Sequence, residues 1–427
     1  MRIFYSLVWW LILPFALVRL LWRGKKEPGY RRQIGERLGF YPQSRIAPGC
    51  IWVHAVSVGE TRAAEPLIRA LLEAYPDKGI LLTAMTPAGR ETGVALFGDN
   101  PQLMQAYLPY DTQFMMRRLI RHFSPRLCIL METEIWPNLI AQCRASQVPV
   151  ALVNARLSER SLAKGERFSS LFREAAGGIS CVAAQTQTDA IRLKHFGSTR
   201  VVVAGSVKFD VMPTDDAIKK GHALKSLIGE RPVLMCASTR DGEEVLVLDA
   251  LSELTPSNTL VIIVPRHPQR FDEVAQLISS RKWTMLRRSE LGANLESARP
   301  VSPDTRILLG DSMGEMFSYY AACDVAFIGG SLKPLGGQNL IEACALGKPV
   351  IVGPHTFNFE TITQDAVLHK AAIRISSATE LMEKAGDLLG DVSLREDRGK
   401  AAYQFAMQQK GATQKTLDLL RPFLEEA

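Results

Sequence analysis

The chain has 427 residues, enough for two or three domains that each bury a core of their own. Hydrophobic residues make up 47% and charged residues 22% of the sequence, which excludes a disordered chain and a collagen-like repeat. The net charge of +7 is concentrated in the first 45 residues, where nine basic residues stand against two acidic ones. The composition therefore indicates an anionic partner beside the N-terminus and no nucleic-acid-binding surface across the whole chain.

An apolar segment opens the chain. Residues 3–22 are apolar except for Ser6 and Arg19, and twenty helical residues are about 30 Å long, the thickness of the hydrocarbon layer of a bilayer. The pattern predicts an uncleaved membrane anchor over residues 1–22. The positive-inside rule places the rest of the chain in the cytoplasm, because basic residues follow the segment directly: Arg23, Lys25, Lys26, Arg31 and Arg32.

Two other interpretations of this segment stay open at the level of sequence. A cleaved signal peptide is one, although the positive charge follows the apolar run and no small-residue cleavage site is present. A helix that lies in the membrane interface, kinked at Pro14, is the other. The sequence does not decide whether an anchor here spans the bilayer or lies flat.

Seven cysteines are spread along the chain, with no CxxC pair. This spacing argues against a zinc site and against a disulfide framework. Most of them stand in apolar runs, so we expect small buried hydrophobic residues in a reducing compartment.

Short apolar runs alternate with helical patterns, which predicts βαβ units and mainly parallel sheets. The first half has predicted helices at 61–74, 136–146 and 188–195, and strands at 51–57, 80–85, 127–131, 148–154, 179–184 and 201–204. A polar stretch then interrupts the alternation, and strands resume at 233–238, 259–264, 305–309, 325–328 and 350–352. The prediction is an α/β protein with two Rossmann-like domains. Its parts are an anchor (1–22), an N-terminal domain (23–210), a linker (211–230), a C-terminal domain (231–400) and a C-terminal helix (401–427).

Open parallel sheets bind ligands beyond the carboxyl ends of their strands, so the turns from strand to helix should hold the chemistry. None of these turns carries GxGxxG, GxxxxGK[ST] or HExxH, which argues against a dinucleotide dehydrogenase, a P-loop protein and a zincin. In the first half, Glu60 follows the strand at 51–57 and stands at the start of a helix. A carboxylate there can accept a proton from a hydroxyl group, but Ser57 and Glu60 also have the spacing of a capping box.

Two more turns of the first half carry charged residues. Glu132 and Glu134 follow a buried strand directly, before a helix that Pro137 opens. One acidic residue at a helix start is common, because its negative charge interacts favourably with the helix macrodipole. Two adjacent to the same helix start indicate a functional role. Lys208 stands near the end of the half, where it can stabilise a leaving group or simply pair with Asp210.

The second half has three turns suited to a nucleotide. Arg266 and His267 stand between two prolines at a strand end. Residues 310–316 form a glycine-containing turn whose free N–H groups can bind an anion. Residues 329–343 combine two glycine pairs, the helix-capping Asn339 and an acidic residue one turn later, Glu342, which can bind a ribose diol. A glycine loop, a helix and a glutamate in the second of two α/β halves are what a nucleotide-sugar glycosyltransferase requires.

The motifs HAVSVGE, METEIWPN, NARLS, GSVKFD, PRHP, GDSMGEM, GGS…GGQNLIEA and GPHTFNF together resemble the Kdo transferases of lipopolysaccharide biosynthesis. The resemblance runs in one order from the N-terminus to about residue 360. It implies the GT-B fold, two Rossmann-like domains facing a central cleft, with the last helix crossing back to the first domain. It also implies transfer of Kdo from CMP-Kdo to the lipid A precursor (lipid IVA), at the cytoplasmic face of the bacterial inner membrane.

The resemblance implies roles for particular residues. Glu60 matches the general base, and Glu132 and Lys208 match positions that support the transition state. CMP-binding positions are matched by Arg266, His267, Met313, Gly314, Glu315, Asn339, Leu340, Ile341 and Glu342. We expect an inverting single displacement without a metal or other cofactor, and we expect the basic side chains of Arg31, Arg32 and Arg37 to face the phosphates of the lipid. The alternatives are a GT-B transferase or epimerase that uses a UDP-sugar, and a catalytically inactive membrane scaffold.

Overall fold

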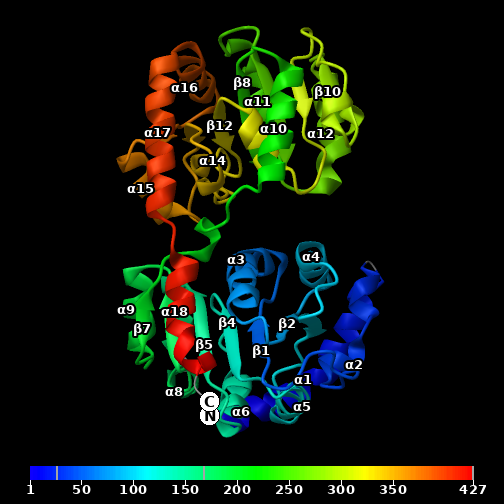
Figure 1. Cartoon of the computed structure of the whole chain (residues 1–427), viewed down its shortest axis with the longest axis vertical. Coiled ribbons are helices and arrows are strands. Elements are labelled where there is room, and N and C mark those ends of the chain that lie inside the picture. Colours follow the sequence, from blue (N-terminus) through cyan, green and yellow to red (C-terminus); the bar gives the residue numbers. More distant parts are fainter. Residues whose placement is uncertain (26, 167–168, 426–427) are drawn as a thin grey trace. The chain divides into compact units, whose positions relative to one another are not determined.

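The computed structural model describes residues 1–25, 27–166 and 169–425, so Lys26 of the predicted basic cluster lies outside the described residues. The chain divides into two compact units. The N-terminal unit comprises Met1–Asp210 and Gln409–Ala427, and the C-terminal unit comprises Val211–Gln408. Each unit is built around one parallel seven-stranded sheet (Figure 1).

The sheet of the N-terminal unit has the order β3-β2-β1-β4-β5-β6-β7, and every paired strand is parallel to its neighbour. Its strands are β1 Ile51–His54, β2 Ile80–Ala84, β3 Leu103–Tyr107, β4 Leu127–Met131, β5 Val150–Ala155, β6 Cys181–Ala184 and β7 Val201–Val203. The connecting helices include α3 Val58–Ala74, α4 Pro87–Phe97, α5 Gln113–Phe123, α6 Pro137–Ala145, α7 Glu159–Glu166, α8 Ser169–Ala176 and α9 Gln187–His195.

Successive side chains of a strand point to opposite faces of the sheet, and here both faces are buried. In β1, Ile51 and Val53 pack with α3 and with α18 (Ala412–Glu425), while Trp52 packs with α5 and α6 on the other face. This double burial explains why the central strands are continuous apolar runs. Figure 1 shows α18 on the N-terminal unit, where Asp210 caps it by accepting hydrogen bonds from the N–H groups of Gly411 and Thr413.

The sheet of the C-terminal unit has the order β10-β11-β9-β8-β12-β13-β14, again with parallel pairs. Its strands are β8 Val233–Thr239, β9 Leu260–Pro265, β10 Met285–Arg287, β11 Ile307–Leu309, β12 Val325–Ile328, β13 Val350–Val352 and β14 Ala372–Arg374. The helices are α10 Asp215–Ile228, α11 Glu243–Ala250, α12 Phe271–Ser280, α13 Met316–Ala322, α14 Ile341–Ala345, α15 Glu360–Leu368, α16 Ala378–Gly390 and α17 Val392–Gln408.

The structure corrects three parts of the sequence-based organisation. Most of the predicted linker is helix α10, which Thr214 caps and which packs closely on α13 at Gly221. Residues 401–408 belong to α17 of the C-terminal unit, and only the chain from Gln409 onward lies on the N-terminal unit. Strands β3, β10 and β14 were not expected.

Both sheets reverse their strand order at one point. In the N-terminal unit the chain runs outward from β1 through β2 to β3 and then returns to β4 beside β1. The C-terminal unit repeats this reversal between β8 and β12. Such a topological switch point opens a crevice at the carboxyl ends of the two strands, and ligands of α/β proteins bind there.

All seven cysteines are free and buried, as the spacing predicted. The expectation for Arg37 was wrong, because its side chain is buried and so does not face a lipid phosphate. Its guanidinium carbon lies 3.9 Å from the ring centre of Tyr107, and it donates a hydrogen bond to the carbonyl of Met85. Arg31 and Arg32 are exposed.

Candidate active site

Glu60 stands at the switch point of the N-terminal unit, in the first turn of α3 after β1. Its Oε2 accepts a hydrogen bond of 2.8 Å from the N–H of Val56, and its Oε1 accepts one of 3.2 Å from the hydroxyl of Ser57. The carboxyl group therefore holds the turn that leads into α3, without the hydrogen bonds of the capping box that the spacing suggested. These hydrogen bonds also fix the carboxyl group in one orientation.

Glu132 follows β4, the strand on the other side of the switch point. Its backbone has φ of 58°, an uncommon conformation for a residue other than glycine, and its N–H donates to the carbonyl of Val153. The side chain forms an ion pair of 2.6 Å with the ammonium group of Lys208. The alternative that Lys208 pairs with Asp210 is wrong, because Asp210 caps α18 instead.

The carboxyl groups of Glu60, Glu132 and Glu134 influence one another. Burial raises the pKa of Glu60, and the charge of Glu132 raises it further, while the hydrogen bonds to the carboxyl group and the ammonium of Lys208 lower it. Burial and then the neighbouring Glu60 raise the pKa of Glu134 to about 7. Like charges in a half-buried site disfavour joint ionisation, and this adds to the effect of burial on Glu134.

Buried polar groups surround this cluster. His54, at the end of β1, is fully buried, and burial lowers its pKa to about 4, so it is neutral at physiological pH. Its Nδ1 lies 2.9 Å from the hydroxyl of Thr83, and its ring lies 6.3 Å from that of Trp136. Within the described part of the chain, Nε2 of His54 and Nδ2 of Asn154 have no hydrogen-bond partner.

The switch point of the C-terminal unit is organised by Glu243, at the start of α11. Its buried carboxylate accepts hydrogen bonds from three backbone N–H groups, at Arg240 (2.9 Å), Gly330 (2.5 Å) and Leu332 (2.9 Å). The first of these residues follows β8 and the other two follow β12, so one side chain joins both turns. Gly330 has φ of 70°, a conformation that glycine adopts without strain.

Arg266 and His267 follow β9 and are exposed. Burial lowers the pKa of His267, and three neighbouring arginines lower it further: Arg240, Arg266 and Arg270. Arg270 is held by Glu244, with contacts of 2.8 and 3.2 Å to its two carboxyl oxygens. Three arginines therefore gather at the carboxyl ends of β8 and β9, and arginine side chains suit an anionic ligand.

Met313 and Gly314 are exposed in the turn after β11, where Gly314 has φ of 80°. Glu315 does not present a free carboxylate in this turn. It pairs with Arg288 at 2.9 Å and accepts a hydrogen bond from the hydroxyl of Ser312 at 2.5 Å. These contacts fix the turn and leave its tip open.

The segment between β12 and α14 contains the last group of residues predicted to bind the nucleotide. Oδ1 of Asn339 accepts from the N–H of Ile341, and its Nδ2 donates to Glu342 at 3.3 Å. Leu340 and Ile341 are buried, so their side chains are not exposed to a ligand. Asn339 thereby fixes the start of α14 and the carboxyl group of Glu342 together.

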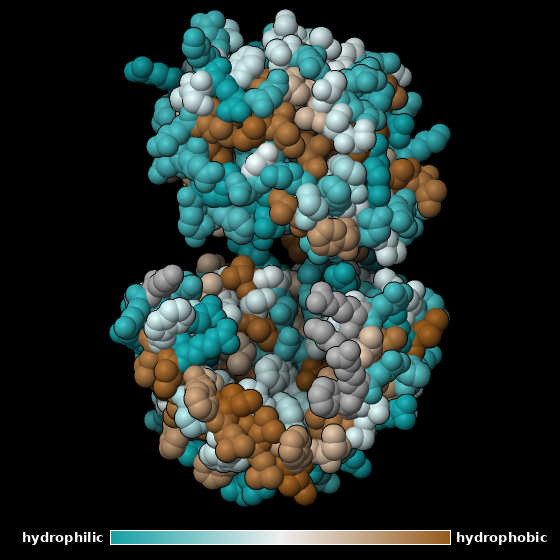
Figure 2. All heavy atoms as spheres, turned by 180° about the vertical axis from the view of Figure 1, so that it is seen from behind, coloured by the Kyte–Doolittle hydropathy of each residue, from teal (hydrophilic) through white to brown (hydrophobic). Residues whose placement is uncertain are grey.

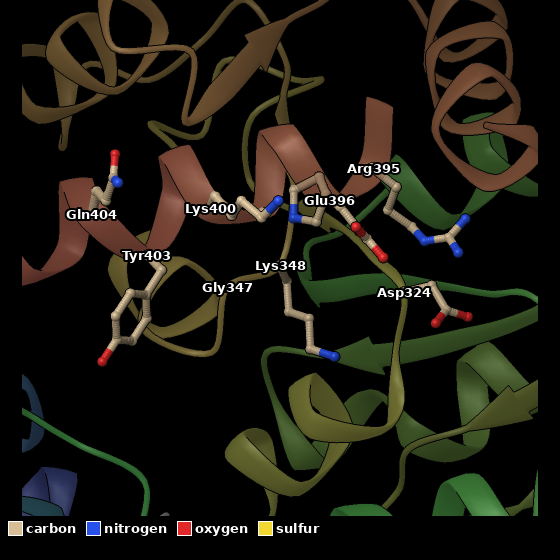
Figure 3. A pocket seen from close by; sticks show the side chains of 10 residues that line it. Asp324, Gly347, Lys348, Arg395, Glu396, Lys400, Tyr403 and Gln404 are labelled. Carbon is tan, nitrogen blue, oxygen red and sulfur yellow. The ribbon is translucent and has the colours of Figure 1, made fainter. Parts of the chain in front are cut away.

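A cavity of about 440 Å³ lies elsewhere in the C-terminal unit, at the opposite edge of the sheet from these turns (Figure 3). Asp324 precedes β12, and Lys348 precedes β13. The charged groups of both side chains already have partners within the protein: Asp324 pairs with Lys225 at 3.0 Å, and Lys348 donates a hydrogen bond to the carbonyl of Cys323. None of the sequence-predicted site residues lines this cavity.

Sequence comparison places the chain among known proteins. The family described as "3-Deoxy-D-manno-octulosonic-acid transferase (kdotransferase)" matches residues 32–211, and "Glycosyl transferases group 1" matches residues 293–405. The chain is 43% identical to the 3-deoxy-D-manno-octulosonic acid transferase of Bordetella pertussis, over 95% of both chains. It is 37% identical to the enzyme of the same name from Haemophilus influenzae, over 99% of both.

Solved structures agree in fold. A glycosyltransferase from Rickettsia africae superposes with a TM-score of 0.59 at 14% identity, covering 89% of this chain and 100% of that one. The UDP-GlcNAc 2-epimerase of Neisseria meningitidis superposes with a TM-score of 0.57 at 15% identity, covering 87% of this chain and 99% of that one. At such low identity these likenesses show the two-unit architecture alone. The two parallel sheets and the whole-length sequence match together establish that this chain belongs to the 3-deoxy-D-manno-octulosonic acid (Kdo) transferases, glycosyltransferases of the GT-B type.

Proposed function

We propose that this enzyme transfers Kdo from CMP-Kdo to the lipid A precursor at the cytoplasmic face of the inner membrane, by a single displacement with inversion. The observation that carries the proposal is the Glu60 carboxyl group. It is oriented by two hydrogen bonds at the switch point of the N-terminal unit, beside the Glu132–Lys208 ion pair. The family match supports the reaction class, and the geometry supports the roles below.

Glu60 acts as the general base. An acceptor hydroxyl attacks the anomeric carbon of Kdo while its proton passes to Glu60, and the bond from that carbon to the CMP phosphate breaks. A carboxyl group whose pKa is raised by burial is a stronger base than an ordinary glutamate, which favours this proton transfer near neutral pH. The Lys208 ammonium, paired with Glu132, supplies positive charge for the transition state.

The turns of the C-terminal unit bind the CMP half of the donor. Arg266 and His267, in the turn after β9 where three arginines gather, suit the phosphate, and the exposed turn at Met313 and Gly314 suits the base. Glu342, oriented by Asn339, suits the ribose diol. Arginine side chains and backbone N–H groups neutralise a phosphate leaving group directly, so we propose transfer without a metal.

Calorimetry with nucleotides tests this assignment of the donor. In buffer containing EDTA, CMP is expected to bind the full-length enzyme more tightly than UDP does, and Arg266→Ala is expected to weaken CMP binding roughly tenfold, the loss of about 1.4 kcal/mol. Arg299→Ala, at an exposed position outside the three turns, serves as the matched control. Tighter binding of UDP contradicts the proposal and favours a UDP-sugar enzyme, and binding of CMP only after metal addition contradicts metal independence.

The pH profile of kcat/KM tests the base and its neighbours. Transfer needs ionised Glu60, so kcat/KM is expected to fall as pH falls through its pKa. Glu132→Gln removes a negative neighbour and moves this acidic limb to lower pH, whereas Lys208→Met removes a positive neighbour and moves it to higher pH. If the acidic limb of the kcat/KM profile moves in the same direction in both variants, or moves in neither, Glu60 is not the general base.

A further inference from the structure

Helix α1 (Arg2–Arg23) is held against the N-terminal unit along its length. The hydroxyl of Tyr5 donates to Asp111 at 2.8 Å, and the hydroxyl of Ser6 donates to Asn138 at 3.1 Å. Leu13 is buried in a cluster with Tyr110. At the helix ends, Arg2 pairs with Glu174 at 3.0 Å and Arg31 donates to the carbonyl of Leu21.

The contacts near the start of α1 belong to a buried polar network. Asp111 accepts hydrogen bonds from the backbone N–H groups of Asn138 and Leu139 as well as from Tyr5, and Asn138 donates from its side chain to the carbonyl of Asp111. Asp111 and Asn138 are fully buried. Removing α1 would leave a buried carboxylate short of one donor and expose the side chains beneath the helix, at a cost in free energy.

The outer face of α1 is apolar and unpartnered. Among the described residues, α1 is the one helix long and apolar enough to cross a membrane, with a mean hydropathy of 1.9. Figure 2 shows apolar residues gathered in a band on the surface of the N-terminal unit. The large apolar side chains of α1 that are exposed by about half or more are Ile3, Phe4, Leu7, Trp10, Leu11, Ile12, Phe15, Val18, Leu21 and Trp22.

Basic residues accompany this apolar face. Exposed side chains at the end of α1 and directly after it carry positive charge, and they suit the phosphates of anionic lipids: Arg19, Arg23, Lys25, Arg31 and Arg32. α1 itself contains no acidic residue. An apolar face with a neighbouring basic cluster is typical of a helix that lies in a membrane interface.

We propose that α1 lies flat in one leaflet of an anionic bilayer while it stays docked on α5 and α6, and that it does not cross the membrane. Crossing requires the helix to be surrounded by lipid, which breaks the contacts of Tyr5, Ser6 and Leu13 with the folded unit. The in-plane arrangement keeps these contacts and buries only the exposed apolar face. This inference rests on the proposed membrane function and adds the orientation of the anchor, which the sequence left open.

Sidedness of the two chain ends tests the orientation. The full-length enzyme is made in a Gram-negative host with a protease-cleavable epitope tag before Met1 and a different one after Ala427. Protease is added to right-side-out spheroplasts and to inside-out inner-membrane vesicles, and each tag is followed by immunoblot. Detergent-solubilised enzyme provides the control that both sites can be cleaved.

A flat helix places both ends on one side, so both tags are expected to be cleaved in inside-out vesicles and to be protected in spheroplasts. The in-plane orientation is overturned if the N-terminal tag is cleaved in spheroplasts and not in inside-out vesicles. It is also overturned if the N-terminal tag is cleaved in neither preparation until detergent is added. The C-terminal tag reports separately on the proposed function, because its cleavage in spheroplasts places the catalytic units outside the cytoplasm. If it is cleaved in neither preparation before detergent, the cytoplasmic placement likewise fails.

Discussion

Replacing Glu60 by glutamine is expected to lower the rate of Kdo transfer by roughly 10²–10⁴-fold, the usual contribution of a positioned general base. Glutamine keeps an oxygen that accepts the hydrogen bond from Val56, so the turn before α3 and the start of the helix should persist. What is lost is the ability to take up the acceptor proton. The measurement is kcat with saturating CMP-Kdo and acceptor, together with CMP affinity and thermal stability.

The matched control is Glu73→Gln, an exposed residue on the same helix. This variant should transfer Kdo at the rate of the unchanged enzyme. Glu60→Gln should bind CMP normally, since the proposed nucleotide site lies in the other unit. A Glu60→Gln enzyme that keeps near-normal turnover shows that another group accepts the proton, and Glu134, with a pKa of about 7, would be the first to examine.

Replacing Glu243 by alanine is expected to destabilise the C-terminal unit by about 3 kcal/mol or more, and to weaken CMP binding. The carboxylate accepts from three backbone N–H groups in two turns, and the variant leaves these donors without their partner. Each buried donor without a partner costs about 1–3 kcal/mol. The turns after β8 and β12 would then no longer be held together at the switch point.

Urea unfolding of the full-length enzyme and calorimetry with CMP measure these two effects. Glu253→Ala removes an exposed carboxylate from the same unit and is the control expected to change neither. Unaltered CMP affinity in a folded Glu243→Ala enzyme would show that the joined turns do not shape the nucleotide site. Destabilisation below about 1 kcal/mol would show that water or a rearranged turn satisfies the three N–H groups.

The sequence predicts the central strands well and three of the four edge strands poorly. β4, β12 and β13 lie inside their sheets with both faces buried, so each is a continuous apolar run, and their predicted bounds match the structure. β3 contains Gln105, while β10 and β14 end in Arg287 and Arg374 at the sheet edges. These three edge strands are partly exposed, so they tolerate polar side chains and give no apolar signal. The fourth edge strand, β7, is a run of three valines and was predicted.

The polar stretch at 211–230 shows a similar difficulty. Its charged residues suggested a linker, yet Thr214 caps a helix there, acidic residues occupy the first turn and Lys225 the last. These are helix-start and helix-end signals. The apolar side of α10 is narrow because Gly221 packs closely on α13, so hydrophobic periodicity alone does not reveal the helix.

The turns that hold the candidate site residues were predictable from the sequence, but the ion pairs and hydrogen bonds between these residues were not. Strand-to-helix turns at the carboxyl ends of parallel strands already pointed to Glu60 and Glu132. The ion pair of Glu132 with Lys208 joins residues 76 positions apart, and local sequence gives only the nearer Asp210 as a partner. Glu243 was not singled out from the sequence, because this residue stands in none of the glycine motifs. The signal that could have found it was an acidic residue at the start of the helix that follows β8.

Mass spectrometry of the lipid after incubation with CMP-Kdo and purified lipid A precursor tests directly whether Glu60 drives Kdo transfer. We expect the unchanged enzyme to add Kdo to the lipid and to release CMP, and we expect Glu60→Gln to yield no comparable product in the same time. A lipid of unchanged mass with the unchanged enzyme, or equal product from Glu60→Gln, would contradict this expectation.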